Sequence, residues 1–344
     1  MLPAISVVVT THNQSEALRR HLPQILEQEY AGGFEVIVVD INSTDDTLTY
    51  LESLEGTYTN LRVISTPDSA RNISKLRMAL TLAFRTANNE WVMVTQADCE
   101  PSSPHWLTSM GKACQSEETM MVLGYTRYAD GKGWLWLRYH FMRIWQQMLH
   151  LQWTKTHPAY RCDGTNLCYR RSFFLNHKGF ADDSNLQLGA TDIMVNHNST
   201  LANTQYVACP EAIVMQDTPR YYRKWLQERT FFMETRRHFH NRMAYCMHYL
   251  REPLVTWVPT ILMLTTMVWG IMNGNIVAPI AVFTLWLALM AYQTYRINKQ
   301  FAAMGEQPIW GVMPLLLHLV LVWDIVAWLS WLFTNRQTFQ KKYI

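Results

Sequence analysis

Two aspartates that each follow an apolar, strand-like segment are the side chains best placed to do chemistry in this 344-residue chain. The apolar run 91–95 leads to Asp98 just before Pro101, and the run 34–40 ends in Asp40 before a polar turn. Aspartate is common after strands because it favours turns and helix N-caps, so neither residue alone is specific. Two acidic strand ends together predict a site for a nucleotide and a divalent cation, because ligands of α/β domains bind at the carboxyl ends of strands.

Strands and helices alternate along the first hundred residues, and this pattern predicts the sheet that must position the two aspartates. Apolar, β-branched runs occur at 5–10, 34–40, 61–64 and 91–95, with helical patterns between them, the last at about 74–87. The alternation predicts a parallel sheet with helices on both faces. Right-handed crossovers bring the carboxyl ends of such strands to one edge, so Thr10, Asp40 and Asp98 are expected to lie near one another.

The composition changes after Pro253, where three nearly uncharged apolar stretches begin: 254–272, 276–295 and 311–333. Each is about long enough to cross a bilayer as a helix, which needs ~20 apolar residues. We therefore expect a domain of residues 1–240, followed by a membrane domain of residues 253–344 with about three helices.

No cleavable signal is expected before the first strand, and six cysteines without a CxxC pair favour reduced thiols. The first domain should then lie in the cytosol, at the cytoplasmic (inner) membrane.

Two further segments suggest contact with the membrane surface. The stretch 134–153 mixes six aromatic residues with arginines, histidines and glutamines, which favours an amphipathic helix lying in the membrane interface; the alternative is a core helix. Basic residues are frequent at 220–251, which favours the cytosolic side and anionic head groups; the alternative is a solvated helix face.

The topology of the last apolar stretch is ambiguous in the sequence. Three spans would place the tail with Arg336, Lys341 and Lys342 outside, although basic residues favour the inside. Either the last stretch is re-entrant or the short tail tolerates this placement, and we expect three spans. His318 and Asp324 lie within the stretch and should face protein or water, because polar groups in contact with lipid are costly.

Five motifs in a fixed order carry a resemblance to a known family: 10–13, 35–45, 74–80, Ala97-Asp98 and 163–171. Together they resemble the inverting family 2 glycosyltransferases over about residues 4–235. The resemblance implies an α/β fold of the GT-A type, a Rossmann-like nucleotide-diphospho-sugar transferase domain followed by C-terminal transmembrane helices. It also implies that Thr10 and Asp40 contact the base and ribose of a nucleotide-sugar donor and that Lys75 helps to hold the nucleotide. Asp98 matches the last acid of the family's D-x-D pattern and would bind Mg²⁺ or Mn²⁺ on the donor diphosphate.

The chain departs from the family pattern at two places. Gln96 stands where the first acid of D-x-D is usual, and it suits a ribose hydroxyl or a water better than a metal ion. The acidic cluster that supplies a catalytic base in relatives is reduced to Asp192, our candidate base, with helix capping as the alternative role. Asp182 and Asp183 in the preceding loop are weaker substitutes.

The late segment 221–229 resembles the part of the family that carries an aromatic residue near the acceptor and a basic residue near the diphosphate. Trp225 comes before Gln227 and Arg229, an order that differs from the usual one, and an interfacial helix would supply the same residue types. Gly164 and Asn166 would shape the acceptor loop behind the sugar.

The leading hypothesis is a metal-dependent, membrane-bound hexosyltransferase that moves a sugar to a lipid-linked or cell-surface glycan acceptor. Transfer to a polyprenyl phosphate is the enzymatic alternative, because an acceptor that is already an anion needs less help from a base. A degenerate, non-catalytic subunit of a glycan-assembly complex is the other alternative. The turn at 10–15 lacks the glycines of a G-x-G-x-x-G dehydrogenase fingerprint. A net charge of +3 gives no reason to expect a nucleic-acid partner.

Overall fold

The first four strands form the parallel sheet that the sequence predicts. The computed structural model describes residues 1–67, 74–180, 186, 189–240 and 242–335. The strands run in the order β3-β2-β1-β4: β1 (Ile5–Thr11), β2 (Phe34–Asp40), β3 (Leu61–Ser65) and β4 (Trp91–Gln96). All pairs among them are parallel, with Thr11 opposite Asp40 and Thr10 opposite Gln96. Their carboxyl ends therefore meet at one edge, as the alternating pattern predicts.

The sheet becomes mixed beyond β4, and a second small sheet forms beside its carboxyl edge. The order continues through β8 (Leu167–Arg170), which is antiparallel to β4, and then β6 (Met121–Gly124) and β9 (Thr204–Val207). The small sheet has the order β5 (Cys99–Pro101), β10 (Val214–Gln216), β7 (Thr126–Tyr128). Pairing of Gln216 with Cys99 brings the end of β10 next to the segment after β4.

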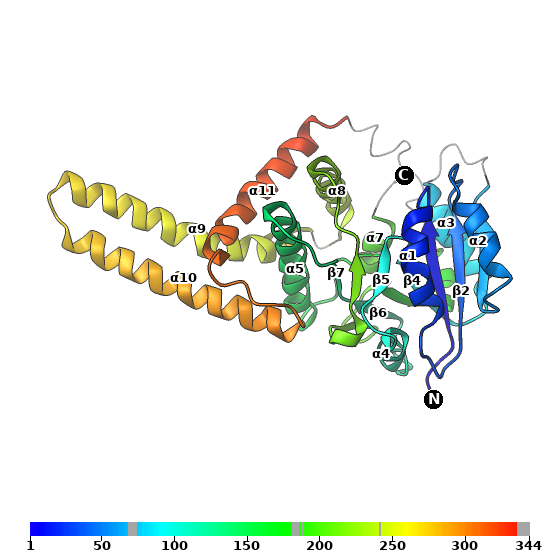
Figure 1. The fold of residues 1–344 in the computed structure, drawn as a ribbon. Helices are drawn as coiled ribbons and strands as arrows, with labels where there is room; N and C mark the ends of the chain where they lie inside the picture. The colour runs from blue at the N-terminus through cyan, green and yellow to red at the C-terminus, as the bar shows by residue number, and fades with distance from the viewer. Residues whose placement is uncertain (68–73, 181–185, 187–188, 241, 336–344) are drawn as a thin grey trace.

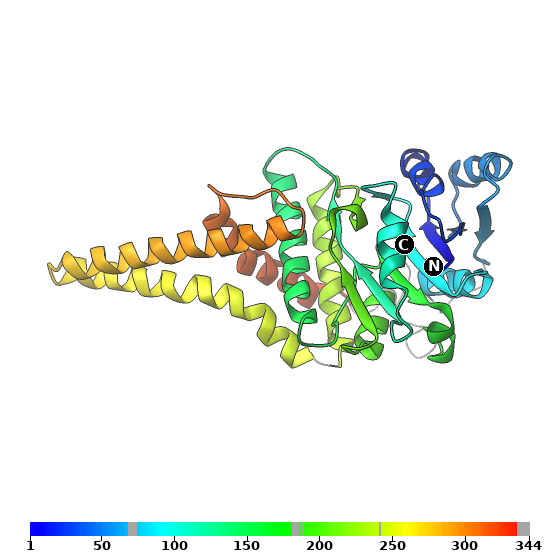
Figure 2. The same ribbon diagram turned by 90° about the horizontal axis from the view of Figure 1, so that it is seen from below.

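Helices cover both faces of the large sheet (Figures 1 and 2). One face packs on α1 (Ser15–Leu26), α2 (Thr47–Glu55) and α4 (Trp106–Ala113), and the other on α3 (Lys75–Thr86), α6 (Arg171–Asn176) and α7 (Ala190–Asn198). Val7 and Val9 enter the first core and Val8 the second. This division follows from the alternation of side chains along a strand, so a run of buried residues indicates a strand covered on both faces.

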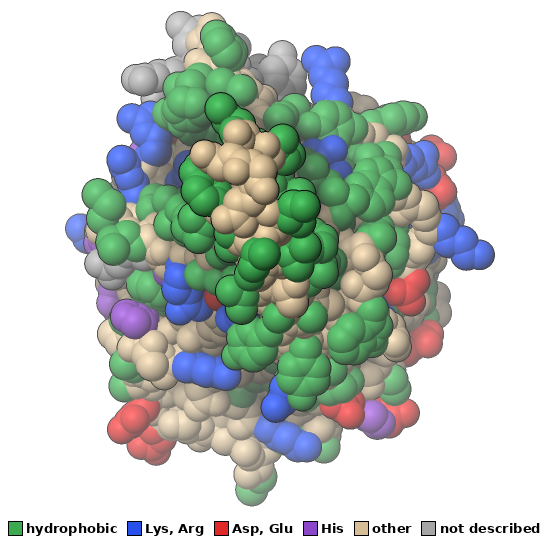
Figure 3. Space-filling model, turned by 90° about the vertical axis from the view of Figure 1, so that its left-hand side faces the viewer, with side chains coloured by type: hydrophobic (Ala, Val, Ile, Leu, Met, Phe, Trp, Pro, Cys, Tyr) green, Lys and Arg blue, Asp and Glu red, His purple; other side chains and the backbone are tan. Residues whose placement is uncertain are grey.

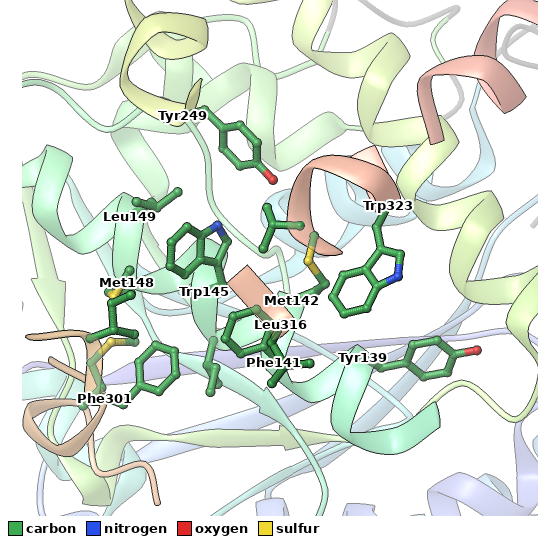
Figure 4. Close-up of a cluster of buried hydrophobic side chains, with 14 of the residues drawn as sticks. Tyr139, Phe141, Met142, Trp145, Met148, Leu149, Tyr249, Phe301, Leu316 and Trp323 are labelled. Atoms are coloured by element: carbon green, nitrogen blue, oxygen red, sulfur yellow. The ribbon is translucent and has the colours of Figure 1, made fainter. Parts of the chain in front are cut away.

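A third core joins the α/β domain to the C-terminal helices. It is built from α5 (Trp134–Thr154), α8 (Tyr222–Thr235), α9 (Arg242–Met272), α10 (Val277–Ala303) and α11 (Met313–Phe333). Two short 3₁₀ turns, at Pro210–Ala212 and Arg236–His238, complete the described elements. Figure 4 shows side chains from α5, α9, α10 and α11 meeting in this core, so the α/β domain and the C-terminal helices share one packed interior.

The helix α5 forms as predicted, but it lies in a protein core and not at a membrane interface. Eleven of its side chains are buried, among them Tyr139, Phe141 and Trp145. Trp134 and Leu135 in the first turn are exposed. The aromatic content that suggests a lipid interface arises instead because α5 packs between the small sheet and the C-terminal helices, where large rings fill the third core.

Three C-terminal helices are long and apolar enough to cross a membrane: Tyr245–Met272, Val277–Ala303 and Met313–Phe333. The first two form a long antiparallel hairpin that projects from the rest of the molecule (Figures 1 and 2). They extend beyond the stretches 254–272 and 276–295 on the side of the α/β domain. Seen from the hairpin side, hydrophobic side chains dominate this face, with Lys and Arg around them (Figure 3).

The polar residues of α11 contact protein, as expected. His318 Nε2 lies 2.8 Å from Thr260 Oγ1. Asp324 accepts hydrogen bonds from Arg229 Nη2 at 2.7 Å and from the Tyr249 hydroxyl at 2.6 Å. The desolvation of these groups is therefore offset by protein partners.

Candidate active site

A pocket of about 410 Å³ lies between α5, α7 and α8 and the ends of β4 and β10. Its polar lining comes from strand ends, the loop before β8 and three helices, a convergence of segments that are distant in sequence. These residues include Gln96, Arg143, Gln146, Arg161, Asp163, Thr165, Asp192, Gln216, Lys224, Gln227, Glu228 and Arg229. A concave site with convergent charged groups is the expected setting for chemistry.

Asp98 lies next to this pocket and is joined to it by one side chain. Gln216, which lines the pocket, donates a hydrogen bond from Nε2 to Asp98 Oδ2 at 3.2 Å. The Asp98 carbonyl accepts the Asp217 N–H at 2.9 Å, which fixes the backbone after β4. Gln96 also lines the pocket, so the end of β4 forms part of its wall.

The surroundings of Asp98 suit a cation that is shared with a substrate. The neighbouring Cys99 thiol lies 3.6 Å from Asp98 Oδ1, and burial raises the pKa of this thiol well above its ordinary value, so it remains protonated. Among the described residues, no three or more His, Cys, Asp or Glu side chains are grouped to hold a metal ion. One carboxylate fits Mg²⁺ or Mn²⁺ held jointly with a diphosphate, because such ions commonly take one or two carboxylates plus substrate phosphates.

A second group of polar residues lies along the same sheet edge, at the ends of β1 and β2. Asp40 is fully buried, and its Oδ2 accepts the Ser43 N–H at 3.1 Å. Asp40 Oδ1 and Thr11 Oγ1 are buried without a hydrogen-bond partner in the described part of the chain. Thr10 is also buried, and its carbonyl accepts the Ala97 N–H at 3.1 Å. Buried polar atoms without partners are uncommon, and the hydroxyl or amide donors of a nucleoside would satisfy them.

Lys75 is the first residue of α3 and follows the N-cap Ser74. Because α3 leads from β3 towards β4, its N-terminus belongs to the edge that carries the strand ends. Thr10, Asp40 and Lys75 do not line the 410 Å³ pocket. These three predicted nucleotide contacts and the pocket, which Gln96 lines, are therefore separate parts of one edge.

Asp192 lies within the pocket, in the first turn of α7. Gly189 occupies the N-cap of that helix, and the Asp192 carboxylate instead accepts the Cys162 N–H at 2.9 Å, with Arg161 Nε 3.7 Å away. Burial raises the pKa of Asp192 to about 6, although the Arg161 guanidinium acts in the opposite direction. A carboxyl group with this pKa is ionised at neutral pH and still basic enough to take a proton. Asp182 and Asp183, the weaker candidates, lie outside the described residues.

Sequence reasoning missed a charged cluster around Asp192. Asp163 is almost fully buried, with Arg161 Nη2 3.0 Å from one oxygen and Arg143 Nε 3.7 Å from the other. Glu228 also lines the pocket, and burial raises its pKa. Asp163 begins the last of the five motifs, a signal that could have marked it. Arg143 belongs to the helix assigned to the membrane interface, and local pattern contains no signal that pairs the two residues.

The site can be compared with known proteins at this point. Residues 6–176 match the family model for glycosyl transferase family 2. This part of the chain belongs to glycosyltransferase family 2. The solved mannosyltransferase PcManGT from Pyrobaculum calidifontis, in complex with GDP-Man and Mn²⁺, superposes with a TM-score of 0.59 at 20% identity. The match covers 97% of this chain and 88% of that one, which confirms the GT-A fold.

Two curated relatives extend the comparison. The chain is 32% identical over 133 residues to the uncharacterized protein y4gI of Sinorhizobium fredii, which is 38% of this chain and 14% of that protein. It is 23% identical over 238 residues to the probable glycosyltransferase YdaM of Bacillus subtilis, which is 67% of this chain and 54% of that protein. The matched region is therefore about half or less of the length of these relatives.

Gly164 and Asn166 shape the loop behind the pocket in different ways. Gly164 has φ +66°, and a Cβ there would lie 2.6 Å from Thr191 Oγ1, so glycine allows the loop to pass close to α7. The buried Asn166 amide donates to the carbonyls of Tyr125 and Ala212 and accepts the Trp106 indole N–H. These three hydrogen bonds use both amide N–H groups and the carbonyl oxygen of the side chain, so Asn166 ties three segments together.

Trp225, Gln227 and Arg229 of α8 all line the pocket. The Trp225 ring is stacked on Tyr139 with centroids 5.1 Å apart, and the Arg138 guanidinium lies 4.6 Å from its centre. Arg229 reaches the pocket wall while its Nη2 pairs with Asp324 of α11. The pocket wall is thus tied to a C-terminal apolar helix by an ion pair.

We expect Asp324→Asn to lower the free energy of unfolding by about 3–5 kcal/mol, because it leaves the Arg229 guanidinium nine-tenths buried without a countercharge. Thermal unfolding of the detergent-solubilised protein measures the effect. The double variant Arg229→Met/Asp324→Leu should recover most of the lost stability, since it removes both charges. Equal losses in the single and double variants would contradict the ion-pair explanation.

Proposed function

We propose that this chain is a membrane-bound glycosyltransferase that moves a sugar, with inversion, from a nucleoside diphosphate donor to a lipid-linked or cell-surface glycan acceptor. The observation that carries the proposal is one pocket that joins Asp192, with its raised pKa, to Asp98 through Gln216. An inverting transfer needs a base for the acceptor hydroxyl and a group that stabilises the departing diphosphate. The pocket offers a candidate for each.

In this mechanism Asp192 accepts the proton of the acceptor hydroxyl as that oxygen attacks the anomeric carbon. The Cys162 N–H and Arg161 orient the carboxylate, and their positive character keeps the ionised form populated at neutral pH. Asp163 pairs with Arg161 from the other side. Its negative charge opposes the effect of Arg161 and so helps to keep the pKa of Asp192 raised. Asp163 therefore helps to set the pKa of the proposed base, Asp192.

Asp98 would hold Mg²⁺ or Mn²⁺, which when bound supplies positive charge next to the leaving diphosphate. Gln96 lies at the same strand end and would bind a ribose hydroxyl or a water ligand. Thr10, Asp40 and Lys75 would hold the nucleoside portion of the donor along the neighbouring strand ends. Arg229 would stabilise diphosphate charge from the opposite wall.

The acceptor side of the proposal rests on the position of the pocket beside the membrane helices. Trp225, Tyr139 and Phe232 give part of the pocket an apolar wall, and the helices that carry them share a core with α9 and α11. Trp225 and Gln227 would contact the acceptor there. We place the catalytic domain on the cytosolic side of the cytoplasmic (inner) membrane, in keeping with the exposed Arg242 and Arg251 in the first turns of α9.

A polyprenyl phosphate acceptor is a second candidate because the pocket contains four cations: Arg143, Arg161, Lys224 and Arg229. Asp163 pairs with Arg143 and Arg161, and Asp324 pairs with Arg229, which leaves Lys224 as the pocket cation without an ion pair in the described part of the chain and available to an anionic acceptor. Such an acceptor would arrive already ionised and would depend less on Asp192. Loss or retention of turnover without this carboxylate separates the two acceptors.

A donor screen tests the proposed function. The detergent-solubilised full chain should show a higher apparent melting temperature with one class of nucleotide sugar, and more so with Mn²⁺ or Mg²⁺. Ligand at 100 times its dissociation constant stabilises the native state by about 2.7 kcal/mol. The same donor should be hydrolysed slowly without acceptor. Absence of both thermal shift and hydrolysis with every donor would overturn the proposal and favour a non-catalytic subunit.

A further inference from the structure

The end of α11 is fixed to the α/β domain, which bears on how many times the chain crosses the membrane. Trp331 Nε1 donates to Glu234 Oε2 at 2.7 Å, and Ser330 Oγ lies 3.0 Å from Thr230 Oγ1. Both partners belong to α8, and the Arg237 guanidinium of the 3₁₀ turn that follows α8 lies 5.5 Å from the Trp331 ring centre. These contacts place the last turns of α11 beside charged residues of the catalytic domain.

The beginning of α11 lies deeper along the hairpin. His318 contacts Thr260 of α9, and the Trp257 indole donates to the His318 carbonyl at 3.2 Å. Thr260 is 12 residues before Met272, which ends α9, so it lies about 18 Å from the hairpin tip at 1.5 Å per residue. From this depth α11 runs back towards the catalytic domain. Part-way along, Asp324 of α11 accepts a hydrogen bond from the Tyr249 hydroxyl of α9.

The segment between α10 and α11 also begins at the catalytic domain. Tyr125 donates a hydrogen bond to Glu306 at 2.5 Å, and Glu306 is buried. The chain then turns back along α10, where Asn298 and Ile309 exchange two hydrogen bonds of 2.8 Å. Trp310 follows and is exposed, in keeping with a ring at the level of lipid head groups. The chain therefore leaves the catalytic domain and returns to it through α11.

The outward side of α11 is apolar although its other side packs on protein. Its exposed side chains are Leu315, Val322, Ile325, Trp328, Leu329, Leu332 and Phe333. Figures 1 and 2 show α11 running obliquely to the α9–α10 hairpin rather than alongside it, and ending near α8. The exposed apolar side is continuous with the hydrophobic face around the hairpin base (Figure 3). This continuity identifies its occupant as the bilayer leaflet next to the catalytic domain.

We propose that the membrane domain has two spans, α9 and α10, and that α11 is a re-entrant helix embedded in one leaflet. The segment that leads into α11 and the end of α11 then both lie on the side of the catalytic domain. A third full span would separate Trp331 from Glu234 by a hydrocarbon core of ~30 Å, whereas the structure joins them by a hydrogen bond. The basic residues Arg336, Lys341 and Lys342 of the sequence would then also lie on that side, as the positive-inside rule favours.

Cysteine labelling of the full chain in sealed membrane vesicles tests this topology. Cys209 and Cys246, the two cysteines that are not fully buried, are first replaced by serine. Single variants Glu52→Cys in the catalytic domain, Asn273→Cys at the hairpin tip and Asn335→Cys after α11 are then exposed to a membrane-impermeant maleimide. The vesicles are prepared in both orientations.

Asn335→Cys should be labelled in the same vesicle orientation as Glu52→Cys, and Asn273→Cys in the opposite orientation. Labelling of Asn335→Cys together with Asn273→Cys would overturn the proposal and establish three spans. Thr334→Cys provides a second position if Asn335→Cys fails to reach the membrane. The outcome does not depend on the proposed activity, because labelling reports position rather than turnover.

Discussion

Replacing Asp98 with asparagine should reduce sugar transfer by about 10²- to 10³-fold, because a cation that stabilises a leaving diphosphate contributes several kcal/mol. Asparagine preserves the shape and can still accept the hydrogen bond from Gln216, so the pocket wall should remain intact. The carboxylate charge alone is removed. Initial rates measured across a Mn²⁺ titration are expected to show a lower maximum and a weaker dependence on the metal.

Glu100→Gln is the matched control for Asp98→Asn. Glu100 lies two residues further along, and its Oε2 is 2.8 Å from His21 Nδ1 of α1, away from the pocket lining. Its substitution should leave the Mn²⁺ dependence unchanged. If Asp98→Asn shows the Mn²⁺ dependence of the wild type, Asp98 does not bind the metal ion and the proposed metal site is wrong.

Asp192→Asn should reduce transfer to a hydroxyl acceptor by about 10²- to 10⁴-fold, the usual contribution of a general base. The wild-type rate should also fall as the pH drops below about 6, because the base acts in its ionised form and its pKa is raised to about 6. The acid limb of a kcat/KM profile on the wild-type protein measures this value. The limb should be absent from the residual activity of the variant.

The same substitution should stabilise the fold at neutral pH. The folded-state pKa of Asp192 lies above its ordinary value, so the native state binds more protons than the unfolded state between about pH 4 and pH 6. Stability from this group is therefore lost as the pH rises through that window. Asparagine can still accept the Cys162 N–H and carries no charge, so the free energy that the buried carboxylate costs at pH 7.5 is regained. The melting temperature should rise by about 2–4 °C for each kcal/mol of this free energy.

Asp130→Asn is the control for this second substitution, since Asp130 is 80% exposed and pairs with Arg127 away from the pocket lining. It should change neither the acid limb nor the melting temperature. Full turnover in Asp192→Asn, together with loss in Asp98→Asn, would favour an acceptor that is already an anion, such as a polyprenyl phosphate.

The sequence by itself determined the first four strands, the helices between them, the helix at 134–153, the three apolar C-terminal helices and the residues at the ends of those four strands. The strands β1 to β4 appear at the predicted positions because β-branched runs between helical patterns are local signals. The placement of Asp40 near the end of β4 follows from the parallel order, which the alternation already implies. The five motifs pointed to the family for the same reason, since each is a short run of neighbouring residues.

The tertiary structure decided which way apolar and charged surfaces face. The aromatic residues of α5 have the same composition whether they meet lipid or a protein core, and only the packing of α9 to α11 against them places them in the core. Arg143 and Asp163 are 20 residues apart without a periodic relation, so their approach depends on the loop before β8. Hydropathy predicts where α11 begins and ends, but it does not predict that the helix runs back towards the catalytic domain. That path follows from its contacts with α8. Long-range packing is what local sequence pattern does not encode, and in this protein it sets the electrostatics of the pocket and the path through the membrane.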